Sequence, residues 1–172
     1  TDWEVTYTVK EYEDQNWNAV WEAQFDPIEI GDFVQIRAPF HDAKANFEHD
    51  ILIQPQMSFG TGHHQTTHLM MQRMKGEDWQ GKQVLDMGCG TGILAILAEK
   101  CGAGNIDAID IDKWSFDNTK ENIELNSCST IKPILGGKEV IPNSSYDVIL
   151  ANINRNILLD QIALYAKHLV SG

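Results

Sequence analysis

Hydrophobic positions along the chain follow two periods, an alternation typical of strands and a spacing of three or four residues typical of helices. Strand-like apolar runs lie at residues 33–36, 51–53, 83–88, 105–111, 131–135 and 146–152. Helical spacing occurs around residues 69–74, at 92–101 and 113–126, and in a last segment that carries Leu158, Ile162, Tyr165 and Leu169. Strands that alternate with helices of about ten to fifteen residues predict an α/β fold. We expect a Rossmann-like open parallel sheet with helices on both faces.

The beginning of the chain has a weaker pattern. Apolar residues alternate between Trp3 and Val9 as in a strand, and they recur at helical spacing between Trp17 and Phe25. No complete small core can be built from these residues, so we interpret 1–30 as an appendage or linker and 31–172 as the main domain. In the first helix of the main domain, Leu69, Met70 and Met74 are expected to lie on one face.

Composition and charge limit the kinds of function that the chain can have. The chain has 42% hydrophobic and 22% charged residues, as a globular domain does, and a formal net charge of -12. No apolar run approaches the roughly 18 residues of a membrane span. Lysines and arginines are scattered singly, and the negative charge repels nucleic-acid phosphates, so a direct nucleic-acid partner is disfavoured. The same charge favours a basic protein partner, although it also serves solubility alone.

The three cysteines, Cys89, Cys101 and Cys128, are odd in number and widely spaced. This spacing matches neither a disulfide framework nor a zinc site. Free thiols indicate a reducing, cytoplasmic setting. We predict no metal ion.

A glycine-rich turn lies where the first long strand meets a helix. Residues 86–92 read Asp-Met-Gly-Cys-Gly-Thr-Gly, and glycines there allow a sharp turn and the close approach of a ligand. The dinucleotide fingerprint needs Gly-x-Gly-x-x-Gly, but Ile93 stands at its third position. Asp86, before Gly88 and Gly90, instead suits a ligand with a positive charge. S-adenosylmethionine, which has a charged amino group and a sulfonium, is such a ligand.

A carboxylate ends the next strand, as a nucleoside site requires. Asp110 lies about twenty residues past the glycines, where a carboxylate accepts hydrogen bonds from ribose hydroxyls and repels a 2′-phosphate. Asp112 is the competing acid, and we assign it to the cap of the following helix.

Residues 55–67 form a second unusual segment, with glycines, histidines and threonines before a helix. Loops of this composition usually have a function beyond connection, and we interpret this one as a lid over the cofactor. Thr67 is expected to contact the cofactor or to cap the helix.

Asn152 ends the last predicted strand, and ligands bind at the carboxyl ends of strands in an open parallel sheet. Its side-chain carbonyl is suited to accept a hydrogen bond from a substrate amine and to orient the nitrogen lone pair. Methyltransferases that act on nucleic-acid bases usually continue such an asparagine with two prolines and an aromatic residue. Ile153 and Asn154 follow here, so that stacking platform is missing.

In these motifs the chain closely resembles the bacterial methyltransferases that modify large-subunit ribosomal protein eleven. The matching segments are residues 59–67, 86–96, 110–112 and 151–153, and the resemblance covers roughly residues 15–172. It implies cofactor contacts at Thr67, Gly88, Asp110 and Asn152. It also implies methylation of lysine side chains and of the N-terminal amine of that protein.

The resemblance further implies that residues 1–30 are the tail of an N-terminal substrate-recognition domain with its linker helix. Additional strands are usual in the family after the last helix, so we expect the chain to be truncated. It departs from the family pattern at Lys113-Trp114, where a proline-containing turn is usual, and at Arg155-Asn156, where small residues are usual.

The predicted reaction is an in-line methyl transfer to a neutral amine, in which the protein supplies mainly proximity and orientation. His63 or His64 is a general base only if the lid closes over the site, and proton loss to solvent is the simpler hypothesis. Other hypotheses are a methyltransferase with a small-molecule or nucleic-acid acceptor, an NAD-binding oxidoreductase, and a non-catalytic cofactor-binding module. The oligomeric state is not predicted.

Overall fold

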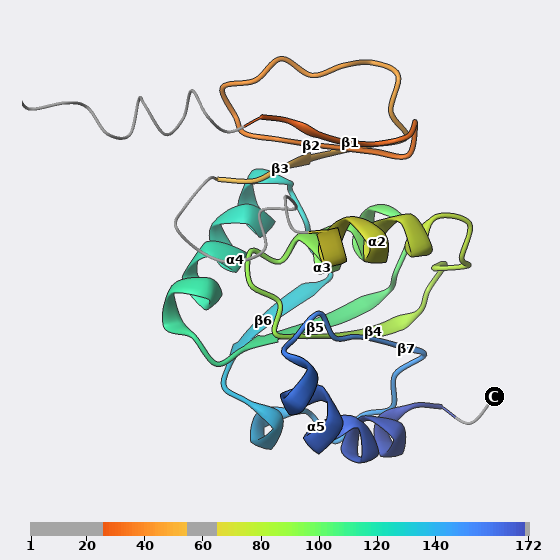
Figure 1. Cartoon of the computed structure of the whole chain (residues 1–172), viewed down its shortest axis with the longest axis vertical. Helices are drawn as coiled ribbons and strands as arrows, with labels where there is room; N and C mark the ends of the chain where they lie inside the picture. The colour runs from red at the N-terminus through yellow and green to blue at the C-terminus, as the bar shows by residue number, and fades with distance from the viewer. Residues whose placement is uncertain (1–25, 55–64, 171–172) are drawn as a thin grey trace, which may run out of the picture.

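The computed structural model describes residues 26–54 and 65–170 (Figure 1). The predictions for the strand and helix before Phe25, for most of the segment 55–67, and for His63 and His64 lie outside these residues. Within the described ranges, no helix is long and apolar enough to cross a membrane.

The main sheet consists of four parallel strands. They are β4 (Gln83–Met87), β5 (Asn105–Asp110), β6 (Ile131–Leu135) and β7 (Val148–Leu150), and their spatial order is β6-β5-β4-β7. The chain leaves β4 toward β5 and β6 and later returns to place β7 on the other side of β4. The predicted open parallel sheet is therefore confirmed. A reversal of strand order at β4 and β7 is the place where such sheets bind ligands, at the carboxyl ends of the strands.

Helices cover both faces of this sheet, as predicted. In Figure 1, α2 (Gln65–Met74), α3 (Ile93–Lys100) and α4 (Lys113–Leu125) lie on one side, and α5 (Arg155–His168) lies on the other. Successive side chains of β4 point to opposite faces of the sheet, and both faces carry apolar residues that helices cover. Val84 belongs to the core cluster on the α3 side, whereas Leu85 and Met87 pack with Tyr165 of α5. Asp86, the remaining inward position of β4, faces α3.

A second sheet lies above α3 in Figure 1. Its strands are β1 (Ile28–Ile30), β2 (Val34–Arg37) and β3 (His49–Leu52), with β1 antiparallel and β3 parallel to β2. The β1–β2 pairing spans the predicted boundary at residue 30. Ile36 and Ile51 share one buried cluster with α3, so the two sheets enclose a common core.

The buried face of α2 includes only part of the predicted apolar face. Leu69 is 61% exposed, and the buried residues of the helix are Thr67, Met71 and Met74. These three positions follow the spacing i, i+4, i+7 of a single helical stripe. Of the predicted apolar face, Met74 is buried and Met70 packs against the core. The polar Thr67 is buried where Leu69 is not, because its hydroxyl accepts a hydrogen bond from Asn152, which follows β7.

The end of the chain also differs from the prediction. β7 is shorter than residues 146–152, because Tyr146 forms only an isolated bridge with Leu169. Tyr165 is the buried residue of α5, whereas Ile162 is 52% exposed. A short 3-10 helix, η1 (Lys138–Val140), connects β6 to β7.

Candidate functional site

The glycine turn after β4 has a backbone that only glycine adopts at low cost. Gly88, Gly90 and Gly92 have φ angles of 72°, 59° and 77°, in the left-handed region. At Gly88 a Cβ atom would also lie 2.3 Å from Cγ2 of Ile153, the residue after Asn152. Gly88 is therefore required twice, for its conformation and for the close approach of the segment that follows β7.

Asp110 holds this turn from the end of β5. Its Oδ2 accepts a hydrogen bond from the Gly90 N–H at 2.8 Å, and its Oδ1 accepts one from the Asp112 N–H at 2.9 Å. Asp112 in turn caps α4, because its side chain accepts a hydrogen bond from the Ser115 N–H at 2.8 Å. The assignment of Asp112 to the helix cap is confirmed, and the carboxylate of Asp110 lies directly beside the glycine turn.

Asp86 lies beneath the turn, 1% exposed. Its Oδ2 accepts a hydrogen bond from the Ala95 N–H of α3 at 3.1 Å. The pKa of this carboxyl is raised from 3.8 to about 7, mainly by burial. The hydrogen bond from the Ala95 N–H opposes this shift, and the negative charge of Asp110 contributes to it. A carboxyl group of the protein itself thus occupies the N-terminus of α3, where an anionic ligand would otherwise find N–H groups.

Two side chains of α4 hold the carbonyl groups of the turn, and sequence reasoning missed both. Thr119 Oγ1 donates to the Gly90 carbonyl at 2.8 Å, and Asn122 Nδ2 donates to the Thr91 carbonyl at 2.9 Å. Both side chains are fully buried. A signal was present in the sequence, since polar residues fill the α4 stripe where an amphipathic helix normally places apolar ones.

Asn152 and Thr67, which are 85 residues apart in the sequence, meet at the edge of the site. Asn152 Nδ2 donates a hydrogen bond to Thr67 Oγ1 at 2.9 Å, and Thr67 is 2% exposed. This bond fixes the orientation of the amide. Among the described residues, no group donates a hydrogen bond to Asn152 Oδ1. The carbonyl oxygen of this side chain is therefore available as an acceptor.

A chain of contacts joins the predicted site residues at the carboxyl ends of β4, β5 and β7. Asp110 binds Gly90, Gly88 contacts Ile153, and the neighbouring Asn152 binds Thr67. Asp86 is the exception, since its carboxyl lies below the turn and is bonded to α3. No group of three histidine, cysteine, aspartate or glutamate side chains suited to a metal ion occurs among the residues that the structure describes.

The buried carboxyl of Asp86 predicts an unusual dependence of stability on pH. Between pH 3.8 and about 7 the folded chain holds a proton that the unfolded chain has released, so the free energy of unfolding falls as pH rises through this interval. Asp86→Asn removes this titration. Relative to the wild type, the variant should gain on the order of 2 kcal/mol between pH 5 and pH 8.

Urea denaturation of both proteins at the two pH values measures this gain. Because other ionisable groups are common to both chains, their contributions cancel in the difference. A difference in stability that is the same at pH 5 and pH 8 would contradict the raised pKa of Asp86.

Comparison with known proteins identifies the family. A family model described as ribosomal protein L11 methyltransferase (PrmA) matches residues 2–172. The ribosomal protein L11 methyltransferase of Phocaeicola vulgatus is 50% identical over 173 residues, which cover 99% of this chain and 62% of that protein. The protein of the same name from Porphyromonas gingivalis is 50% identical over 161 residues, which cover 92% of this chain and 56% of that protein.

A solved structure agrees with these relatives. The crystal structure of the ribosomal protein L11 methylase from Lactobacillus delbrueckii subsp. bulgaricus matches with a TM-score of 0.74 at 32% identity, covering 85% of this chain and 76% of that one. The chain spans 62% and 56% of the length of the two curated relatives above. Since the family model matches almost the whole chain, the chain belongs to the ribosomal protein L11 methyltransferase (PrmA) family.

Proposed function

We propose that the chain binds S-adenosylmethionine and is the methyl-transferring part of an enzyme that methylates amino groups of ribosomal protein L11, on lysine side chains and at the N-terminus. The main observation behind this proposal is that the glycine turn, Asp110 and Asn152 lie next to one another at one edge of the sheet. The name shared by the matching relatives supports the same substrate.

The charges and hydrogen-bonding groups of the site fit this cofactor. Asp110 lies beside the glycine turn and has the acceptor oxygens that a ribose diol needs. The carboxylate of Asp110 places negative charge beside the turn, which suits the positively charged groups of the cofactor. Gly88 and Gly90 leave the backbone uncovered by Cβ atoms, so that a ligand can approach it closely.

The same features disfavour an NAD-binding oxidoreductase. A pyrophosphate normally binds the free N–H groups at a helix N-terminus. Here the carboxyl of Asp86 already accepts the Ala95 N–H of α3, so this N–H is not free to bind a phosphate. Ile93 also interrupts the dinucleotide fingerprint. We therefore propose a nucleoside cofactor without phosphate groups.

Apolar side chains next to Asp110 suit the adenine of the cofactor. Ile111, which follows β5 directly, is 79% exposed, and Trp114, in the first turn of α4, is 77% exposed. An exposed isoleucine and an exposed tryptophan beside a ribose-binding carboxylate offer a surface on which a planar base can pack. We propose that they form the adenine edge of the site, with Trp114 in place of the turn that is usual in the family.

In the proposed reaction, the chain orients a neutral amine for in-line attack. When bound, S-adenosylmethionine would supply the electrophilic methyl group. Asn152 Oδ1 accepts a hydrogen bond from the acceptor amine, while its Nδ2 remains bonded to Thr67 and keeps the amide from rotating. The nitrogen lone pair is then directed to the transferred group, and orientation of this kind is the main contribution of the protein.

The acceptor amine must lose a proton before it attacks. A lysine amine has a pKa of about 10.4 in water, and removal from solvent lowers the pKa of an amine. We propose that the proton leaves to solvent as the amine enters the site. Asp86 does not take it, because its carboxyl is buried under the glycine turn and bonded to Ala95.

A protein acceptor is favoured over a nucleic acid by two further observations. Ile153 and Asn154 follow Asn152, so the prolines and aromatic residue on which a base would stack are missing. The formal net charge of -12 attracts basic proteins and repels phosphates. Ribosomal proteins are a basic class, and the cytoplasm is the compartment where the proposed reaction takes place.

The acceptor class is tested with isotopically labelled S-adenosylmethionine. Offered purified ribosomal protein L11, ribosomal RNA and transfer RNA in separate reactions, the chain should label only the protein. Mass spectrometry of the product should place the methyl groups on amines. Label in either RNA with none in the protein would overturn the proposed acceptor but leave cofactor binding intact.

Asn152→Ala tests the proposed role of the amide. Turnover should fall by about 10²-fold because the amine loses its orientation. The Kd for S-adenosylmethionine should rise by no more than about fivefold, the effect of one hydrogen bond. Binding is measured by calorimetry and turnover by release of S-adenosylhomocysteine.

Asn154→Ala is the matched control. Asn154 caps α5 by accepting a hydrogen bond from the Asn156 N–H at 2.9 Å, so its loss should lower the stability of the helix and leave turnover unchanged. Turnover of Asn152→Ala at the wild-type rate would remove Asn152 from the mechanism.

A further inference from the structure

A ladder of three asparagines runs along the buried face of α4. Asn118 and Asn122 belong to α4, and Asn126 is the residue that caps its C-terminus. Because they are spaced four residues apart, all three lie on one side of the helix. Asn122 is fully buried and Asn118 is 1% exposed. Burial of primary amides is costly unless each is hydrogen-bonded, so the partners of this asparagine ladder show what it holds.

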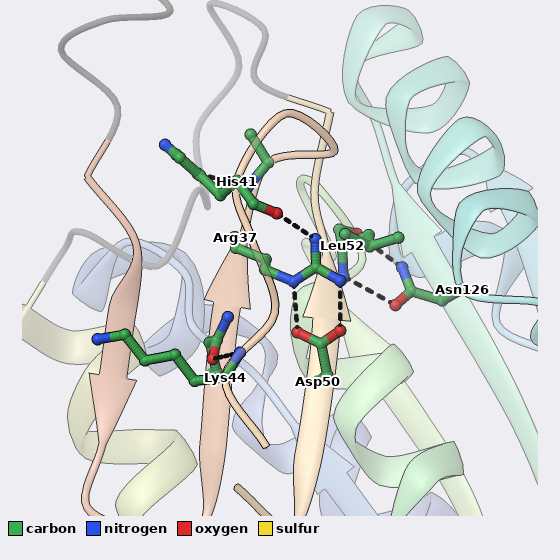
Figure 2. A network of polar contacts seen from close by, with 8 residues as sticks. Arg37, His41, Lys44, Asp50, Leu52 and Asn126 are labelled. Atoms are coloured by element: carbon green, nitrogen blue, oxygen red, sulfur yellow. Dashed lines mark hydrogen bonds and ion pairs between the residues drawn. The ribbon is translucent and has the colours of Figure 1, made fainter. Parts of the chain in front are cut away.

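Asn126 binds the backbone of β3 as another strand would. Its Oδ1 accepts from the Leu52 N–H at 3.0 Å, and its Nδ2 donates to the Leu52 carbonyl at 2.6 Å (Figure 2). The amide thus pairs with both polar groups of one residue on the edge of β3 that faces α4. The opposite edge of β3 pairs with β2, and Figure 2 shows the bidentate ion pair of Arg37 with Asp50 that joins these two strands.

Asn122 makes a similar contact with the backbone two residues further along the chain, just after β3 ends. Its Oδ1 accepts from the Gln54 N–H at 2.8 Å. Four helical residues advance about 6.0 Å, and two strand residues advance about 6.6 Å. The two advances are nearly equal, so the spacing between Asn126 and Asn122 matches the spacing between their backbone partners, Leu52 and Gln54.

Asn122 differs from Asn126 in its second contact. Its Nδ2 donates to the Thr91 carbonyl of the glycine turn at 2.9 Å, whereas Asn126 donates to Leu52 of β3. Nδ2 of Asn122 also contacts Asn118 Oδ1 at 3.4 Å, which keeps the amide in this orientation. One side chain therefore connects the exit of β3 to the turn that surrounds the proposed cofactor site.

We infer that Asn122 is a positioning residue for the binding of S-adenosylmethionine. Its side chain couples Gln54, just after β3, to the backbone of the glycine turn. The inference rests on the proposed cofactor. A rigid turn presents Gly88 and Gly90 in the conformation that the cofactor requires, and loss of the Asn122 amide leaves the Thr91 carbonyl without this donor. Part of the binding free energy of the cofactor is then used to order the turn, so the affinity for the cofactor falls.

A pair of variants separates positioning from stability. Asn122→Ala and Asn126→Ala each remove two hydrogen bonds to backbone groups outside α4, but only the former removes a bond to the glycine turn. Asn126→Ala also removes the bond from its Nδ2 to the Asn122 carbonyl. Both should lower the melting temperature by a similar amount, about 2–8 °C. Only Asn122→Ala should raise the Kd for S-adenosylmethionine, by about fivefold to tenfold, measured by calorimetry on the full chain.

KM for S-adenosylmethionine and kcat should respond differently to the loss of Asn122. With a saturating acceptor, Asn122→Ala should raise KM for S-adenosylmethionine and leave kcat near the wild-type value, because the amide does not contact the acceptor. Equal Kd values for wild type and Asn122→Ala, or the same increase in Asn126→Ala, would overturn the inference. A wild-type chain that does not bind S-adenosylmethionine would overturn the proposed function as well.

Amide hydrogen exchange in the wild-type chain tests the coupling without any variant. Saturation with S-adenosylmethionine should slow exchange of the Gln54 amide, which is bonded to Asn122, by at least about threefold. The Leu52 amide, which is bonded to Asn126, should exchange at an unchanged rate. An unchanged Gln54 amide, or equal slowing at both positions, would contradict the coupling even if Asn122→Ala does not fold.

Discussion

The left-handed backbone between β4 and α3 is the constraint on which the arrangement of the site depends. Gly88, Gly90 and Gly92 have positive φ angles, and such a turn does not hold its shape by itself. Three side chains from two other elements, β5 and α4, fix it. Asp110 of β5 takes the Gly90 N–H, while Thr119 and Asn122 of α4 donate to its carbonyls. The turn is therefore held in shape before any ligand binds.

Polar groups have replaced apolar ones at the positions nearest this turn. Asp86, Thr119 and Asn122 are buried beside the hydrophobic residues that pack between the main sheet and α3. The carboxyl of Asp86 is the costliest of these, since burial raises its pKa to about 7. Proteins accept such losses of stability mainly at functional sites, where the buried groups orient a loop or a ligand. This distribution of polar groups supports a ligand site at the carboxyl edge of β4 and β5.

Local patterns were sufficient to predict the sheet, because strand alternation, helical spacing and glycine turns are properties of neighbouring residues. Asp112 as a helix cap follows from the same kind of signal. Contacts between distant segments were not predictable in this way. The bond between Thr67 and Asn152 spans 85 residues, and it turns Thr67 inward at the expense of Leu69. The partners of Asn122 are likewise set by the packing of β3 against α4, and no short motif encodes them.

The central claim is that the glycine turn, Asp110 and Asn152 surround one nucleoside site. A crystal structure of the chain with S-adenosylhomocysteine tests it most directly. Both ribose hydroxyls are expected to lie within hydrogen-bond distance of the Asp110 carboxylate, with the amino-acid end over Gly88 and the sulfur near Asn152. A ligand bound elsewhere, or a ribose directed away from Asp110, would contradict it.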